Sequence, residues 1–274
     1  MTTSKFIEFV EIVKRLRKEC PWDREQTNDS IKHATLEEAH EVIEAIDNND
    51  PDELKKELGD LLLHVVFHTV IAEGDNKFTL DEVIDSISEK LIRRHPHVFG
   101  DTTVKDAEHV KRNWETIKLQ EGRASVLEGV PENLPALQRA HRLQEKAAKV
   151  GFDWEQKSDV WKKVIEEIEE MHEIEQVKSQ KLKIKNGIDA TGSDAKDELD
   201  EKLESEVGDV FFALVNYARF LGINPENALR KTNRKFIERF NFIEEKLKKN
   251  GKTPNESSLA EMDKYWNESK SLIK

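Results

Sequence analysis

The chain has 274 residues, of which 36% are charged, and its formal net charge is −12. Its apolar runs are far shorter than the roughly 20 residues of a membrane span, so no membrane segment is expected. A single cysteine excludes an intrachain disulfide. The negative charge argues against binding long nucleic acids, whose affinity comes from neutralised phosphates. Acidic residues near the start, where a signal peptide is apolar, favour a cytoplasmic protein.

The scarcity of glycine and proline, with 11 and 7 residues, predicts a mostly helical chain. Apolar residues at helical spacing and capping signals then predict the individual helices. In chain order the predicted helices are 6–17, 29–47, 51–72, 79–94, 105–119, 135–148, 158–183, 197–221, 225–249 and 257–271. No stretch alternates as a strand would, so the predicted fold class is all-α.

Two stretches are expected to interrupt the helices. Residues 123–135, which include Pro131 and Pro135, are interpreted as a linker. The linker separates a predicted N-terminal helical domain at 1–122 from a C-terminal one at 136–274, each a bundle of about four helices. A polar stretch at 185–194 predicts a mobile surface loop inside the second domain.

The two halves carry the same features in the same order, which predicts a tandem repeat. In the first half the features are Glu37-Glu38-Ala39-His40-Glu41, Glu57-Leu58-Gly59-Asp60, Lys90 with Arg94, and Trp114 with Lys118. In the second half they are Glu166-Glu167-Ile168-Glu169-Glu170, Glu206-Val207-Gly208-Asp209, Lys235 with Arg239, and Trp266 with Lys270. The acidic motifs are 16 residues apart in the first half and 36 in the second, so the second half carries a 20-residue insertion.

The paired acidic residues of each half predict a metal site. Residues three and four apart share a helix face, so Glu167 with Glu170 and Glu206 with Asp209 gather four carboxylates if their helices are neighbours. A divalent cation relieves their repulsion, and oxygen ligation favours Mg²⁺, Mn²⁺ or Ca²⁺. The first half offers a matching second set. Its members are Glu38, Glu41, Glu57 and Asp60.

In a chain with 56 acidic residues, one such pair is most often a solvated helix face. Two features favour the metal site. Glu206 and Asp209 adjoin the most apolar helix of their half, and the arrangement occurs twice.

These acidic motifs before an apolar helix resemble the all-α nucleoside triphosphate pyrophosphohydrolase superfamily. Cys20-Pro21-Trp22-Asp23-x-x-Gln26-Thr27, Arg93-Arg94-His95-Pro96-His97-Val98-Phe99 and the tandem repeat resemble MazG proteins in particular. The resemblance covers nearly the whole chain. It implies two MazG-like bundles, Mg²⁺-dependent hydrolysis of a nucleoside triphosphate to the monophosphate and pyrophosphate, broad specificity, and clearance of surplus or aberrant nucleotides. It also implies a homodimer.

The resemblance further implies a role for each site residue. Glu167, Glu170, Glu206 and Asp209 are the implied catalytic and metal-binding set, with Mn²⁺ as a substitute for Mg²⁺. The implied nucleotide contacts are Lys202, Lys235, Arg239, Trp266 and Lys270, with Trp266 either stacking on the base or serving as a core aromatic. The C-terminal half is implied to be the catalyst. The first half keeps every motif residue, which leaves its own activity open.

Two other classes of protein are weighed against this hypothesis. A di-iron carboxylate oxidoreductase needs Glu-x-x-His pairs, and Glu37/His40 and Glu169/His172 have that spacing without occupying matching repeat positions. A non-catalytic helical interaction protein would have one or both halves degenerate. His64-Val-Val-Phe-His68 has the histidine spacing of a zinc protease but lacks its glutamate, so these histidines are interpreted as core-facing or edge residues of an apolar helix.

Overall fold

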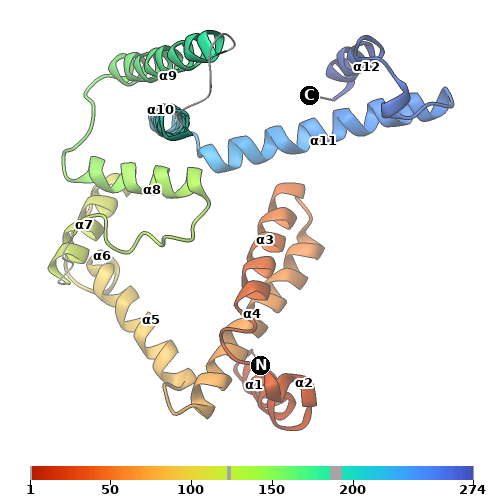
Figure 1. Cartoon of the computed structure of the whole chain (residues 1–274). Helices are drawn as coiled ribbons and strands as arrows, with labels where there is room; N and C mark the ends of the chain where they lie inside the picture. The colour runs from red at the N-terminus through yellow and green to blue at the C-terminus, as the bar shows by residue number, and fades with distance from the viewer. Residues whose placement is uncertain (1, 122–124, 186–192, 274) are drawn as a thin grey trace. The chain divides into compact units, whose positions relative to one another are not determined.

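The computed structural model describes residues 2–121, 125–185 and 193–273. Throughout these ranges the regular elements are helices, which confirms the all-α prediction (Figure 1). The first seven are α1 (Thr2–Glu19), α2 (Pro21–Glu25), α3 (Lys32–Asn48), α4 (Pro51–Gly74), α5 (Leu80–Arg94), α6 (Pro96–Phe99) and α7 (Ala107–Gln120). The others are α8 (Ala136–Lys149), α9 (Lys157–Lys185), α10 (Ser193–Phe220), α11 (Pro225–Lys249), the 3-10 helix η1 (Pro254–Glu256) and α12 (Leu259–Leu272).

The chain divides into two compact units, Met1–Trp114 and Glu115–Lys274, with the division inside α7. The domain limits expected from the sequence, 1–122 and 136–274 with a linker at 123–135, stay a prediction. Among the described residues, none of the helices combines the length and the apolar character that crossing a bilayer requires.

The first unit is organised around the antiparallel pair α3 and α4. Asn49 ends α3 in the left-handed conformation, with φ of 53°. Asp50 then caps α4, because its side chain accepts hydrogen bonds from the backbone N–H groups of Asp52 and Glu53. Pro51 stands at the first helical position, where no N–H is needed. This tight turn fixes the register of α3 against α4.

The core of the first unit lies between α1 and α4. Its buried members are Val10, Val13, Ile31, Val66, Phe67, Val70 and Ile71. All but Ile31 come from α1 or α4, so the hydrophobic contact between these two helices leaves the start of α4, with its acidic residues, away from the core.

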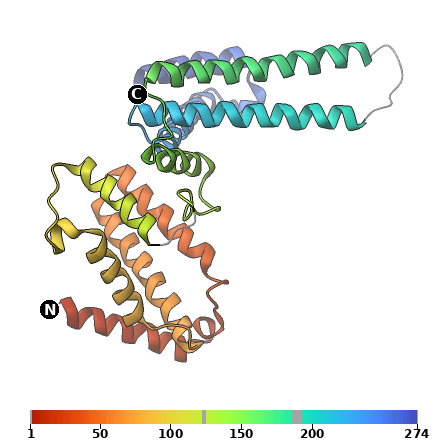
Figure 2. The same ribbon diagram turned by 90° about the vertical axis from the view of Figure 1, so that its left-hand side faces the viewer.

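The second unit is organised around the pair α9 and α10, which run side by side as a long antiparallel hairpin (Figure 2). They have 29 and 28 residues, against 17 and 24 for α3 and α4. The insertion therefore lengthens both helices. The mobile loop predicted at 185–194 falls largely on residues 186–192, which lie outside the described part of the chain.

Two contacts join other helices of the second unit, the first to this hairpin and the second to each other. Gln144 of α8 donates a hydrogen bond from Nε2 to the backbone oxygen of Phe212 on α10, at 2.8 Å. Lys246 of α11 pairs with Glu268 of α12 at 2.5 Å. The buried apolar side chains of the unit are Val160, Val164, Ala213, Val215, Ile243 and Leu247.

Two short α-helices are absent from the sequence prediction. No helix was predicted between residues 17 and 29, but α2 starts at Pro21 with Cys20 as its N-cap. Likewise α6 starts at Pro96. Proline interrupts a preceding helix and also favours the first position of a new one, so the same residue ends one element and begins the next.

Candidate functional site

The first unit brings three of its four predicted carboxylates together. Glu38 and Glu41 of α3 and Glu57 of α4 each offer an oxygen within 4.8 Å of the others. Glu57 is only 8% exposed. Asp60 lies exposed and is not a member of this close group among the described residues. We call Glu38, Glu41 and Glu57 the first-unit cluster. A pocket lined by Glu41, Asp50 and Glu57 opens beside it.

The first-unit cluster is electrostatically unfavourable when no cation is present. Burial, and hydrogen bonds that its protonated form donates to neighbouring Glu53 and Glu41, raise the pKa of Glu57 from its ordinary 4.5 to about 7. Burial and the negative charges of Glu41 and Asp60 also raise the pKa of Glu38. A bound divalent cation would offset the repulsion between these carboxylates and allow Glu57 to lose its proton. Three converging carboxylates are a donor set that fits Mg²⁺ or Mn²⁺.

The raised pKa of Glu57 gives a testable pH dependence of stability. The folded state keeps a proton on Glu57 up to about pH 7, whereas the unfolded chain releases it near 4.5. The stabilisation is therefore complete below pH 4.5 and is lost as pH rises to about 7. We expect Glu57→Gln to reduce the fall in melting temperature between pH 5 and pH 8 in EDTA, measured by circular dichroism. Glu89→Gln, an exposed change on α5, is the control, and an equal fall in both variants would contradict the assignment.

The second unit repeats the arrangement. Glu167 of α9 and Glu206 and Asp209 of α10 offer oxygens within 4.8 Å of one another, and Glu167 is 8% exposed. We call these three residues the second-unit cluster. Glu170 is not a member among the described residues. Burial and the negative charge of Glu167 raise the pKa of Glu170, so it lies within the electrostatic field of the cluster.

A lysine neutralises part of the second-unit cluster. Lys163 Nζ lies 2.7 Å from an oxygen of Glu167 and 2.8 Å from one of Glu166. Hydrogen bonds to Glu166 and Glu167 raise the pKa of Lys163. Lys163 stands four residues before Glu167, and the matching position of the first unit is Ala34. The two clusters therefore share three carboxylates but differ in their neighbouring charge.

The predicted nucleotide contacts of the second half lie on other helices. Arg239 of α11 donates to the backbone oxygen of Ile273 at 2.9 Å, and its guanidinium lies 5.7 Å from the ring centroid of Trp266 on α12. Trp266 also contacts Phe236, with centroids 5.3 Å apart. The half-buried Trp266 ring thus has neighbours on α11, and whether it also stacks on a base stays a prediction.

The remaining predicted lysines differ in their partners. Lys270 donates to Asn267 at 3.0 Å and Lys202 to Glu198 at 2.7 Å. Lys235 is half-buried on α11 and forms no ion pair with any side chain in the described ranges. The described contacts of these cations do not include the second-unit cluster. In the described part of one chain, the second-unit cluster and the predicted nucleotide contacts are thus separate groups.

The matching residues of the first half are distributed similarly. Lys90 and Arg94 lie on α5, while Trp114 and Lys118 lie on α7. The ring of Trp114 meets His95 edge-on, with centroids 5.1 Å apart and an interplanar angle of 82°. The Glu169/His172 pair of the di-iron hypothesis is not arranged as a metal site, because His172 is exposed and pairs with Glu175 at 2.8 Å.

A group of hydrogen-bonded side chains beside the first-unit cluster was not predicted from the sequence. His64 and His68 of α4, interpreted as core-facing or edge residues, both contact the Thr35 hydroxyl of α3, and His64 Nε2 lies 3.8 Å from Glu38 Oε1. The signal was present, since His64 and His68 follow Asp60 by four and eight residues and so share its helix face.

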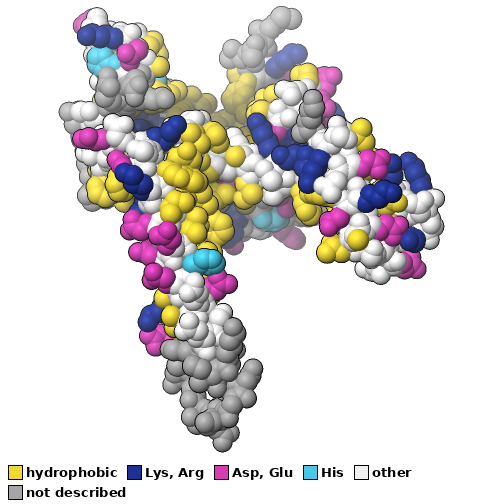
Figure 3. Space-filling view, turned by 90° about the horizontal axis from the view of Figure 1, so that it is seen from above, with side chains coloured by type: hydrophobic (Ala, Val, Ile, Leu, Met, Phe, Trp, Pro, Cys, Tyr) yellow, Lys and Arg dark blue, Asp and Glu magenta, His cyan; other side chains and the backbone are white. Residues whose placement is uncertain are grey.

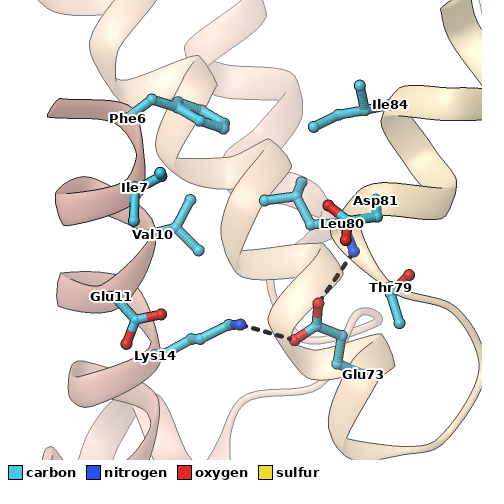
Figure 4. Close-up of a pocket in the computed structure, with 10 residues that line it drawn as sticks. All are labelled: Phe6, Ile7, Val10, Glu11, Lys14, Glu73, Thr79, Leu80, Asp81 and Ile84. Carbon is cyan, nitrogen blue, oxygen red and sulfur yellow. Dashed lines mark hydrogen bonds and ion pairs between the residues drawn. The ribbon is translucent and has the colours of Figure 1, made fainter. Parts of the chain in front are cut away.

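A different pocket in the first unit contains none of the predicted site residues. It opens between α1 and α5, with Phe6, Leu80 and Ile84 as apolar walls (Figure 4). At its base Glu73 accepts from the backbone N–H of Leu80 at 3.0 Å and pairs with Lys14 at 3.5 Å. Lys14, the cation among its lining residues, is already paired with Glu73, and the other charged lining residues are acidic, so the pocket is poorly suited to a phosphate.

Comparisons with known proteins agree with this arrangement. The model of the MazG nucleotide pyrophosphohydrolase domain matches residues 26–99 and 156–242, which contain the two clusters. Nucleoside triphosphate pyrophosphohydrolase/pyrophosphatase MazG of Thermotoga maritima is 42% identical over 97% of this chain and 95% of its own length. Nucleoside triphosphate pyrophosphohydrolase of Escherichia coli K12 is 40% identical over 94% of each chain. Uncharacterized protein YabN of Bacillus subtilis is 47% identical over 97% of this chain and 52% of its own.

The family model matches each unit once, in the same order and around the same acidic motifs. This confirms the tandem repeat and the family resemblance together. Two independent observations therefore agree on the family. Each unit gathers one group of three carboxylates, and relatives that match over nearly the full chain bear the family's name. The chain belongs to the MazG nucleotide pyrophosphohydrolase family.

Proposed function

We propose that the protein hydrolyses nucleoside triphosphates to the monophosphate and pyrophosphate in a Mg²⁺-dependent reaction. The observation that carries the proposal is the second-unit cluster, in a chain whose near full-length relatives bear the name of this activity. Glu167, Glu206 and Asp209 would hold the ion, with Mn²⁺ as a substitute and Glu170 beside them. A divalent ion bound there supplies polarisation of the phosphate and activation of the attacking water.

The cations of α11 and α12 are assigned to the triphosphate. Lys235 and Arg239 share a helix face and would neutralise the negative charge that develops on the leaving pyrophosphate. Lys270 and Lys202 would contribute further phosphate contacts. Trp266 would stack on the base, and since every base has a π-face this contact supports broad specificity. Broad specificity in turn supports a role in clearing surplus or aberrant nucleotides.

The proposal includes a homodimer, because in the described ranges the cations proposed to bind the triphosphate do not contact the second-unit cluster. Large apolar side chains also lie exposed on α10 and α11. Phe211 is 57% exposed, Phe236 55% and Ile237 58%. Figure 3 shows apolar side chains gathered in a band on this face of the second unit. A second copy would cover such surfaces. Light scattering at micromolar concentration checks this, and a monomer mass at all concentrations would contradict it.

A product analysis tests the proposed reaction directly. The chain is incubated with a panel of nucleoside and deoxynucleoside triphosphates and Mg²⁺, and the products are separated by anion-exchange chromatography. We expect monophosphate and pyrophosphate in equal amounts, and no turnover in EDTA. Diphosphate with orthophosphate as products, or no reaction with any triphosphate, would refute the proposal.

A further inference from the structure

The pocket between α1 and α5 of the first unit has a volume of about 550 Å³ and shares no lining residue with the first-unit cluster. We call it the α1–α5 pocket. Sites that take small molecules usually have volumes of about 300–1,000 Å³. Phe6 and Val10 of α1 face Leu80 and Ile84 of α5 across the pocket, so its two walls are apolar (Figure 4). An occupant with an apolar body would remove these side chains from water.

Helix α5 carries an apolar stripe that the described part of the chain leaves uncovered. Leu80, Ile84, Ile87 and Leu91 are three or four residues apart and therefore share a face. None of the side chains of α5 is buried, and Ile84 is 42% exposed. Leu80 and Phe6 pack against the edge of the first-unit core, so the α1–α5 pocket extends that core outward. A ligand in the pocket would complete the packing between α1 and α5.

The polar groups of the α1–α5 pocket give it an excess of negative charge. Glu11, Glu73 and Asp81 contribute three carboxylates, and Lys14 contributes one ammonium group. Lys14 lies 3.5 Å from Glu73, which also accepts a hydrogen bond from the backbone N–H of Leu80. The exposed side chains of Glu11 and Asp81 form no hydrogen bond or ion pair in the described ranges. These two carboxylates are therefore available to a ligand.

The combination of apolar walls and available carboxylates determines the class of ligand. The carboxylates repel an anion. They also do not converge on one point in the described chain, so they do not form the compact oxygen cage that a divalent metal ion needs. An organic cation meets both requirements. Its ammonium group donates charge-assisted hydrogen bonds to Glu11 or Asp81, and its hydrocarbon part contacts the walls.

We propose that the α1–α5 pocket binds an amphipathic organic cation, a primary ammonium group carried by an aromatic or branched aliphatic body. The site is distinct from the proposed hydrolysis of nucleoside triphosphates, and binding to it does not require that reaction. Helix α5 also carries Lys90 and Arg94. A ligand that holds α5 against α1 would thus hold these two cations of the repeat in place.

The second unit does not repeat the base of the α1–α5 pocket. By repeat position, Gly222 and Pro225 replace Glu73 and Leu80. Glycine offers no carboxylate, and proline has no backbone N–H to donate, so the hydrogen bond at the base of the pocket has no counterpart there. Pro225 is also buried. The site is therefore expected in the first unit alone.

Isothermal titration calorimetry of the full chain with three matched probes tests the charge requirement. The probes are phenethylammonium, phenethyl alcohol and hydrocinnamate, which share a phenyl ring on a short chain and differ in charge. We expect the ammonium to bind about 10-fold or more tightly than the alcohol, which is the effect of one hydrogen bond to a charged group. We expect no binding of hydrocinnamate, and a weaker affinity for the ammonium as salt is added.

Paired variants locate the site on the two helices. Glu11→Gln and Asp81→Asn should each lower the affinity for phenethylammonium by about 3-fold or more. The matched controls are Glu8→Gln on α1 and Asp85→Asn on α5, two exposed acidic residues that do not line the pocket. Each control should change the affinity less than about twofold. Ile84→Ser, which removes part of one wall, should weaken binding of the ammonium and of the alcohol alike.

Hydrogen exchange of the backbone amides provides a readout of position that is independent of affinity. We expect phenethylammonium to slow exchange in α1 and α5 and to leave α9 and α10 unchanged. No binding of phenethylammonium, equal affinity for the three probes, equal losses in the control variants, or protection confined to other helices would each overturn the proposal. An affinity that falls as the protein concentration rises would also overturn it, because a second copy of the chain would then be the occupant of the pocket.

Discussion

Asp209→Asn is expected to lower nucleoside triphosphate turnover in the full chain by about 100-fold or more. The change removes one of the three charged ligands of the second-unit cluster, and it keeps the size of the side chain. The lost negative charge weakens binding of the divalent ion, so raising the Mg²⁺ concentration should restore part of the rate. Initial rates over a range of Mg²⁺ concentrations measure both effects.

The matched control is Asp60→Asn at the corresponding position of the first unit. Asp60 lies outside the close group of carboxylates there and is exposed. If the second unit is the catalyst, this variant keeps most of the activity. Equal losses in the two variants would contradict the division of labour between the units. A loss confined to Asp60→Asn would transfer the proposed catalysis to the first unit.

Lys235→Gln is expected to lower kcat by about 100-fold, the effect of removing one donor that stabilises charge in a transition state. Lys235 is half-buried on α11 and has no ion-pair partner among the described side chains, so its charge is available to a ligand. Arg239 already donates to the backbone of Ile273, which supports the view that Lys235 is the freer of the two cations.

Lys231→Gln provides the control for this prediction, since Lys231 is an exposed lysine one turn earlier on the same helix. We expect it to change kcat less than twofold, because exposed charges are well screened. Steady-state kinetics with one triphosphate distinguish the two variants. If both lysines contribute equally, the role of Lys235 is general electrostatic attraction, and a specific phosphate contact is contradicted.

The repeat allowed much of the fold and part of the site to be predicted from the sequence. Apolar periodicity located the long helices to within a few residues, and capping signals such as Asp50-Pro51 located their starts. Helix periodicity also places Glu167 and Glu170 on one face. It does not determine how far each lies from the partner helix. Glu170 and Asp60 lie outside the close groups of carboxylates in the described chain, and their part in metal binding stays a prediction.

The hydrogen bonds of His64 and His68 could not be predicted, for a different reason. Asn28 and His68 are 40 residues apart, and their contact requires the packing of α3 against α4 in one register. A hydrogen bond of this kind depends on tertiary geometry at the scale of an ångström, whereas sequence patterns specify faces of helices. The ion pair of Lys163 with Glu167, in contrast, could have been predicted from the sequence. The two residues are four apart on one helix and therefore lie on the same face.

The lengthening of α9 and α10 places the far end of their hairpin well away from the carboxylates. From Glu170, α9 continues to Lys185, a distance of about 22 Å at about 1.5 Å per residue. The contacts that hold the two helices together therefore extend well past the carboxylates. A backbone cut at the far end would leave two fragments that still recognise each other along this shared length. The second unit is thus suited to being split into complementary halves, and the tight Asp50-Pro51 turn gives the first unit no equivalent position.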